Sequence, residues 1–287
     1  EVFAQLSGLL GTDAAKTVEE LLNAASKPSQ GIPSAVVGVV VLLIGATGAG
    51  FLGRWGVLAN RREFKPGANP QGFFTHLENR TDSRRFLLSG QRDGPKWLSQ
   101  RAHFAAGAAE WVFKADGLEA QLTVCLSPED GALCRRVALT NATPVPIELS
   151  IADCFEVALC NEADYAAHPT FQNLFVESRC AALNALCFAR RPRNPGERCP
   201  VLLHAVAGGD GGAQYETDLS RLIGRTGALS AAGGIAREFT QTAGQVLNPC
   251  SALRVDVKVP PMGRAFVEVA VGLVEPHFMA GYSGGRK

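Results

Sequence analysis

The sequence predicts a mainly β fold: an antiparallel sandwich preceded by a short helical, partly hydrophobic N-terminal appendage. Three observations lead to this prediction. Short runs of alternating apolar and polar residues recur after Arg54, turn sequences such as Asp-Gly and Pro-Glu-Asp-Gly separate them, and no long helical period interrupts them. Glycine is abundant (31 of 287 residues) and charged residues are few (19%), which suits a β-rich chain with one apolar stretch.

The N-terminal appendage has two parts. Residues 1–27 have the pattern of an amphipathic helix pair, and residues 28–53 carry no charged side chain over 26 positions. The apolar part of this stretch, residues 35–53, is 19 residues long, just enough for a helix to cross the hydrocarbon layer of a bilayer. We therefore expect a candidate transmembrane helix at about 33–53. Basic residues that follow it, beginning with Arg54, favour a cytoplasmic location for its C-terminal side.

The rest of the chain divides at a polar and aromatic stretch, residues 163–178, expected to form a loop between strands. Residues 208–245 are rich in Gly and Ala and predict loops with a short helix near 216–224. The expected strands lie within 73–77, 84–90, 109–115, 118–127, 134–141, 146–159, 174–191, 200–208, 251–259 and 264–274. The predicted organisation is a helical segment at 1–48, a sandwich domain at 49–275 and a tail at 276–287.

Charge and cysteine content exclude several function classes. Lys and Arg total 28 against 27 for Asp and Glu, so no basic excess favours nucleic acid. None of the eight cysteines forms a Cys-x-x-Cys pair, and most lie in apolar strand-like runs. We expect reduced, buried thiols, no metal site and no cofactor.

Two motifs suggest chemistry but lack the required context. The glycine-rich stretch within 41–55 resembles a dinucleotide-binding turn, but the apolar run before it is too long for the first strand. Lys65 and Pro66 stand near the position where that motif needs an acidic residue. The Gly-Tyr-Ser-Gly-Gly sequence at 281–285 matches a nucleophile elbow but has no downstream Asp and His.

The stretch 163–178 allows two interpretations. In one, His168 and Pro169 form a turn, and Phe171 and Phe175 belong to the core. In the other, Asp164, His168 and Asn173 present hydrogen bonds to a polyhydroxylated ligand beside an aromatic face. Composition alone does not choose between them.

Five blocks of the sequence occur in the order found in glycoside hydrolase family 94. They lie at 126–159, 163–178, 189–197, 215–225 and 244–261. This family, formerly glycosyltransferase family 36, contains cellobiose phosphorylases and cyclic β-1,2-glucan synthases. The chain most resembles the glucan-synthase branch, over roughly 49–273. The resemblance implies an N-terminal β-supersandwich domain that packs against a catalytic (α/α)6 barrel.

The segment 48–61 resembles the family's glycine-rich entry segment, in which an Arg-Trp pair approaches the sugar site. Arg54 and Trp55 match that pair, whereas Phe51 replaces the usual tyrosine and the acidic element that normally follows is reduced to Arg-Glu. Upstream, residues up to about 47 resemble a different family, the ribonuclease-BN-like (BrkB-type) inner-membrane proteins. The two resemblances meet near 45–50, which indicates a junction.

The expected function is a non-catalytic, carbohydrate-associated supersandwich domain of a glucan-synthase or phosphorylase-like protein. The resemblance places the family's catalytic residues in a barrel that this chain is expected to lack, so it should not act as an enzyme by itself.

Expected partners are β-glucan, bound weakly, the barrel, and a membrane through residues 33–53. The alternatives are a free-standing carbohydrate-binding module, or a membrane-anchored fusion or truncated product without a ligand. The expected location is cytoplasmic, or the cytoplasmic side of a bacterial inner membrane. The carbohydrate-binding residues implied are Arg54, Trp55, Asp164, His168 and Asn173.

Overall fold

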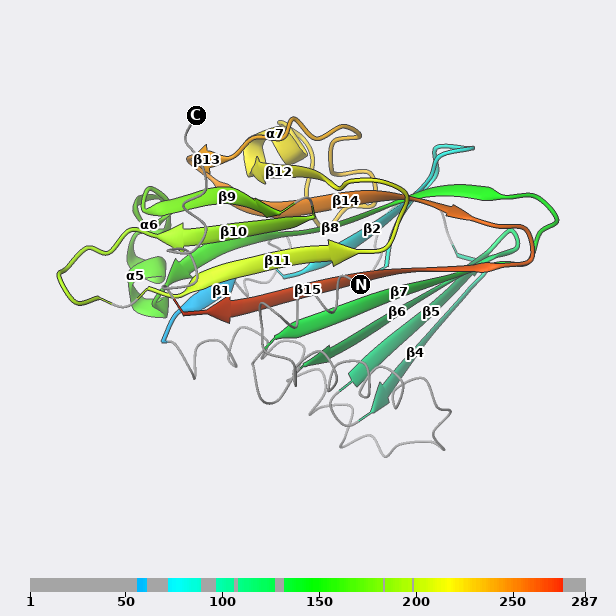
Figure 1. Ribbon diagram of the computed structural model, residues 1–287, viewed down its shortest axis with the longest axis horizontal. Helices are drawn as coiled ribbons and strands as arrows, with labels where there is room; N and C mark the ends of the chain where they lie inside the picture. The colour runs from blue at the N-terminus through cyan, green and yellow to red at the C-terminus, as the bar shows by residue number, and fades with distance from the viewer. Residues whose placement is uncertain are drawn as a thin grey trace.

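The computed structural model describes residues 56–60, 72–88, 97–105, 108–126, 132–182, 184–197 and 199–275. Within them the chain forms two antiparallel sheets that pack face to face, so the predicted mainly β sandwich is confirmed (Figure 1). The appendage at 1–48, the candidate transmembrane helix and the tail at 276–287 lie outside these ranges. In the described part of the chain, no helix is long and apolar enough to cross a membrane.

The smaller sheet is built around one long strand. This strand, β8, pairs with β14 along one side and with β2 and β1 along the other. The β2–β8 pairing joins segments about 75 residues apart in the sequence, such as His76 and Ala152. The described strands of this sheet are β1 (Leu58–Asn60), β2 (Phe74–Asn79), β3 (Arg85–Leu87), β8 (Ile147–Cys160), β12 (Gln214–Asp218) and β14 (Pro249–Val259).

The larger sheet combines two groups of hairpins. Strands β4 to β7 follow one another as a meander, and β15 joins them to β11, β10, β9 and β13. The described strands are β4 (Ser99–Ala105), β5 (Ala108–Ala115), β6 (Leu118–Leu126), β7 (Leu133–Asn141), β9 (Val176–Ala182), β10 (Ala185–Arg190), β11 (Val201–Ala207), β13 (Gly244–Gln245) and β15 (Arg264–Val274).

The main core fills the space between the two sheets. Side chains that alternate along each strand meet there, including Phe86 and Phe155 from the smaller sheet and Phe113 and Phe188 from the larger one. All four are at most 1% exposed. Burial of this many large apolar side chains is the dominant stabilising term of the fold.

A second apolar cluster covers the outer face of the smaller sheet. Phe74 on β2 and Cys154 on β8 point away from the main core and contact the segment that follows β12. That segment begins with helix α7 (Leu219–Ile223), which Asp218 caps by accepting a hydrogen bond from the Ser220 amide at 2.9 Å. The short helix expected near 216–224 is therefore confirmed, although its first residues belong to β12.

The loop expected at 163–178 is wrong in detail, because two short helices occupy most of it. These are α5 (Glu162–Ala167) and α6 (Pro169–Asn173), and β9 begins soon after them at Val176. The local sequence explains both, since Asn161 caps the first helix and Pro169 occupies the first turn of the second.

Six of the eight cysteines are buried, as expected for thiols in strand-like runs. Cys180 is exposed and Cys199 is partly exposed, so the expectation does not hold for these two.

Candidate functional site

Three of the five predicted sugar-binding residues lie on the two-helix segment at one end of the sandwich (Figure 1). They are Asp164, His168 and Asn173. The other two, Arg54 and Trp55, lie outside the described residues.

Asp164 is held in place by the cap of α5. The Asn161 amide group donates to the Asp164 carboxylate at 2.8 Å, and the Asn161 side-chain oxygen accepts from the Asp164 amide at 2.8 Å. Arg193 lies 3.7 Å from the same carboxylate. The carboxylate is about half exposed, so it has a fixed orientation and still faces solvent.

His168 joins the two helices and is exposed. Its backbone amide donates to the Asp164 carbonyl at 3.0 Å, and its own carbonyl accepts from the Gln172 amide at 3.1 Å. The backbone is thus fixed while the imidazole remains at the surface.

Asn173 ends α6 with an unsatisfied acceptor. Its amide nitrogen donates to the Leu247 carbonyl at 3.3 Å. Its side-chain oxygen is buried and has no hydrogen-bond partner in the described part of the chain. An unpaired buried acceptor is costly, so a donor supplied by a ligand or a partner would stabilise this position.

Apolar side chains lie beside these polar groups. Phe171, Leu174 and Leu247 are 47%, 43% and 67% exposed. The interpretation that places both Phe171 and Phe175 in the core is therefore wrong for Phe171, and Gln172 is the α6 side chain that is buried instead. The reason is that Arg190, buried on β10, hydrogen-bonds the Gln172 side chain and its carbonyl.

Cations pack on the aromatic pair. The Phe171 and Phe175 rings meet edge to face at 5.2 Å. The Arg193 guanidinium carbon lies 5.6 Å from the centre of each ring, and that of Arg190 lies 5.0 Å from the centre of Phe175. We call the group Asp164, His168, Phe171, Asn173, Leu174, Arg193 and Leu247 the α5–α6 surface.

Strand β1 joins the sheet beside this surface. Leu58 pairs with Cys160, the last residue of β8 before α5, and packs with Tyr165 of α5 in one buried cluster. Leu58 follows Trp55 by three positions in the sequence. The chain that carries the predicted Arg-Trp pair therefore enters the described fold next to α5.

A second polar cluster was not foreseen from the sequence. Asp153 on β8 forms an ion pair with Arg135 on β7, accepts a hydrogen bond from Thr75 at 2.9 Å, and lies 3.3 Å from the His204 ring. The other ring nitrogen of His204 lies 2.7 Å from the Ser251 hydroxyl. We call these residues the inter-sheet cluster.

The inter-sheet cluster contains a Ser–His–Asp series, yet its position excludes catalysis on a bound substrate. Ser251 and His204 are 0% exposed and Asp153 is 1% exposed, so no reacting group can reach the hydroxyl in this structure. Burial opposes ionisation of Asp153, but Arg135, His204 and Thr75 outweigh it and lower the pKa of the carboxyl. Burial also lowers the pKa of His204, against the influence of Asp153. The cluster connects the two sheets.

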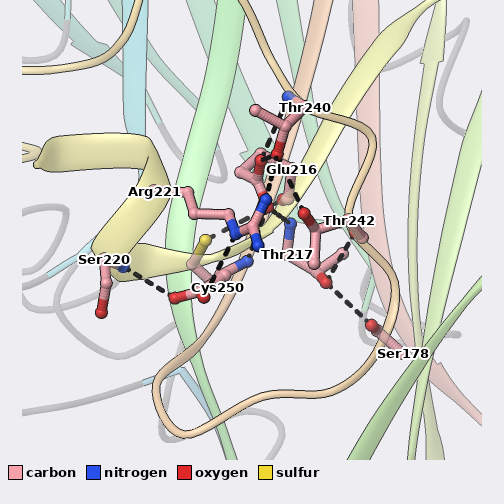
Figure 2. A network of polar contacts seen from close by, with 9 residues as sticks. Ser178, Glu216, Thr217, Ser220, Arg221, Thr240, Thr242 and Cys250 are labelled. Atoms are coloured by element: carbon pink, nitrogen blue, oxygen red, sulfur yellow. Dashed lines mark hydrogen bonds and ion pairs between the residues drawn. The ribbon is translucent and has the colours of Figure 1, made fainter.

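A third polar cluster fixes the loop after α7 (Figure 2). The Glu216 carboxylate is 1% exposed and accepts from the Thr217 and Asp218 amides at 2.9 and 3.0 Å. It also accepts from the Thr240 hydroxyl at 2.5 Å. The Ser178 hydroxyl of β9 donates a hydrogen bond to the Thr217 hydroxyl at 2.9 Å, so the loop is connected to both sheets.

No group of three or more His, Cys, Asp or Glu side chains suited to a metal ion occurs among the residues described in the structure.

Solved structures match the chain at low similarity, including the following three. A putative kojibiose phosphorylase from the human microbiome matches with 5% identity and a TM-score of 0.42, over 74% of this chain and 22% of that one. A polysaccharide lyase matches with 12% identity and a TM-score of 0.38, over 70% of this chain and 25% of that one. The heparan sulfate lyase HepC from Pedobacter heparinus matches with 7% identity and a TM-score of 0.34, over 69% and 24%. This chain spans a quarter or less of the length of these three structures.

No curated protein matches the chain. A family model does: the model described as glycosyl hydrolase 94, supersandwich domain, matches residues 94–279, which is more than half of the sequence. The match includes both helices of the α5–α6 surface and most strands of the two sheets. The chain belongs to the glycosyl hydrolase 94 family and contains its supersandwich domain.

Proposed function

We propose that this supersandwich domain serves a cyclic β-1,2-glucan synthase or a related glycoside phosphorylase-like protein, in which it supports a catalytic barrel and contributes a sugar-contacting rim. The rim would combine the α5–α6 surface with Arg54 and Trp55. The observation that supports this most is the gathering of exposed apolar and polar side chains at one end of the sandwich. Among them, Phe171 is 47% exposed and Asn173 carries a buried oxygen without a partner.

The chemistry of the surface suits a glucan. A pyranose ring has apolar C–H faces that pack on aromatic side chains, and hydroxyl groups that need directional hydrogen bonds. Phe171 supplies a ring that is 47% exposed, the Asn173 side chain an acceptor and Arg193 a donor. The His168 ring can accept or donate, and the Asp164 carboxylate can accept, each from a fixed backbone. Since the surface is open on one side, we expect a dissociation constant in the millimolar range, which corresponds to a binding free energy of about −4 kcal/mol.

Titration of β-1,2-glucooligosaccharides into the full chain, followed by NMR chemical-shift changes, tests this proposal. We expect shifts in 161–175 and 244–248, and weaker binding in the variants Trp55→Ala, His168→Ala and Phe171→Ala. Met262→Ala is the matched control, because Met262 is also a large exposed apolar side chain (72%) and follows β14. It lies past the opposite end of β8, roughly 40 Å away by strand length.

Two results would oppose the proposal. Shifts confined to the end near Met262, or shifts that all three variants leave unchanged, would place the sugar elsewhere. Absence of any shift at tens of millimolar oligosaccharide would favour the other reading of this surface, a face that packs against another domain.

The location proposed for the chain is the cytoplasmic side of a bacterial inner membrane, through residues 33–53. The absence of charge over 26 positions and the basic residues after them support it. Membrane fractionation of the full chain against a chain that begins at Arg54 tests this. Recovery of both in the soluble phase would contradict it.

A further inference from the structure

The outer face of the smaller sheet changes from apolar to charged along its strands. Phe74, His76 and Glu78 follow one another on this face of β2, because side chains of a strand alternate. On β14 the same face carries Ala252 and then Arg254. The apolar half is covered by the segment after α7, and the charged half extends beyond it.

A small pocket lies at this boundary. Its floor is formed by Ser150 and Ala152 of β8, and its sides include His76, Arg85 and Arg254. Ile235 and neighbouring residues of the covering segment form the remaining side. The pocket is separate from the α5–α6 surface, which follows the other end of β8.

The pocket and the residues beside it carry more positive than negative charge. The Glu78 carboxylate is the common partner of three guanidinium groups, at 3.3 Å from Arg85, 3.6 Å from Arg237 and 4.0 Å from Arg254. A fourth arginine, Arg80, is paired with Asp256. Only Arg85, Arg254 and Glu78 of these line the pocket, and Arg237 lies beside it. Three guanidinium groups around one carboxylate leave an excess of two positive charges, while Arg80 and Asp256 lie outside the lining and neutralise each other.

Hydrogen-bonding capacity in the pocket is also unused. Arg254 is 8% exposed, and its one hydrogen bond within the described residues runs from Nε to the Ser150 hydroxyl at 2.8 Å. His76 is 4% exposed, and its ring faces the backbone carbonyls of Leu229 and Ala232, although neither ring nitrogen reaches a partner there with the geometry of a normal hydrogen bond. Buried polar groups in proteins are nearly always satisfied, so a ligand that supplies acceptors is expected at this position.

We propose that this pocket binds a small oxyanion of the phosphate or sulfate type. Guanidinium groups recognise such anions through paired N–H donors, and the excess of two positive charges matches the charge of the ligand. Arg254 and Arg237 would hold the anion, while Glu78 and Ser150 orient the guanidinium groups. The proposal does not depend on the sugar-contacting role of the α5–α6 surface.

Calorimetry and thermal unfolding of the full chain at pH 7 test it, with inorganic phosphate and sulfate compared with chloride at equal ionic strength. We expect both oxyanions to bind and to raise the melting temperature above that in chloride. Arg237→Gln should weaken phosphate binding about tenfold, the effect of losing one charged hydrogen bond. This variant tests the site without risk to the fold, because Arg237 is 59% exposed. Arg254→Gln should have a larger effect.

The matched control is Arg193→Gln, which removes an exposed arginine from the α5–α6 surface and should leave phosphate binding unchanged. Glucose 6-phosphate is a further probe: binding as tight as that of phosphate identifies a phosphate monoester as the ligand class, and weaker binding identifies the free anion. Equal stabilisation by chloride, or phosphate affinity that Arg237→Gln and Arg254→Gln leave intact, would overturn the proposal.

Discussion

Charged side chains are paired and buried differently on the two faces of the smaller sheet. On the inner face Asp153 is sealed between the sheets at 1% exposure, with Arg135 as its ion partner and Thr75 as a hydrogen-bond donor. On the outer face Glu78 lies at the edge of the covering segment with more arginines than it can neutralise. A closed charge cluster specifies how two layers pack, whereas an open and unbalanced one remains available for a ligand.

The largest effect is expected from Arg135→Leu, which leaves the Asp153 carboxylate buried without its cation. We expect the free energy of unfolding to fall by about 3–5 kcal/mol, because a buried unpaired charge is strongly destabilising. Urea unfolding measures it. The double variant Arg135→Leu, Asp153→Leu should recover much of the loss, and a single variant within 1 kcal/mol of the parent would show that the cluster does not connect the sheets.

The next test varies the pH, because a buried histidine lies at each face of the smaller sheet. His76 of β2 is on the outer face, and His204, from β11 of the larger sheet, lies against the inner face beside Asp153. Burial lowers the pKa of His76 to about 4, and that of His204 is also lowered. The folded protein therefore binds fewer protons than the unfolded chain below pH 6.5, and stability falls as the pH decreases from 6.5 towards 4.

For His76 the expected loss between pH 7 and pH 5 is about 2 kcal/mol. Urea unfolding at both pH values measures it. His76→Leu should reduce the difference by that amount, with His103→Leu as a control on an exposed strand. A parent protein equally stable at both pH values would contradict the assignment.

A smaller effect is expected at the cluster of Figure 2. Glu216→Gln replaces one carboxylate oxygen by an NH2 group, which then faces donors instead of accepting from them. We expect a loss of about 1–2 kcal/mol. Hydrogen exchange should show that the substitution speeds the opening of residues 236–244 more than that of β8. Unchanged exchange in that loop would show that its other contacts suffice.

The smallest effect should come from an exposed ion pair. Arg84 and Asp116 form one at the surface, with side chains 36% and 60% exposed. Asp116→Asn should change the free energy of unfolding by no more than about 0.5 kcal/mol, because solvent screens such pairs. A change as large as that of Arg135→Leu would remove the distinction between closed and open charge clusters.

Local sequence determined most of the strands and their alternation. The pattern in 146–159 predicts a strand, and β8 follows it with inner residues such as Ile151 and Phe155 in the main core. The caps of the short helices are equally local, since Asn161 and Asp218 each act on residues two or three positions away. Even so, the local pattern of 163–178 predicts a loop, because helices of five or six residues carry too weak a periodic signal.

The polar clusters were decided by the tertiary structure alone. Arg135 and His204 lie 18 and 51 positions from Asp153, and only the stacking of two sheets brings the three side chains together. In the sequence they are single residues of separate runs, and nothing local relates Arg135, Asp153 and His204 to one another. The same holds for Glu78 and Arg254, whose strands lie on opposite sides of β8. The alternation of apolar and polar residues along a strand predicts which face of the sheet a side chain lies on. Its neighbours are determined by register and sheet order, and these depend on contacts between distant parts of the chain.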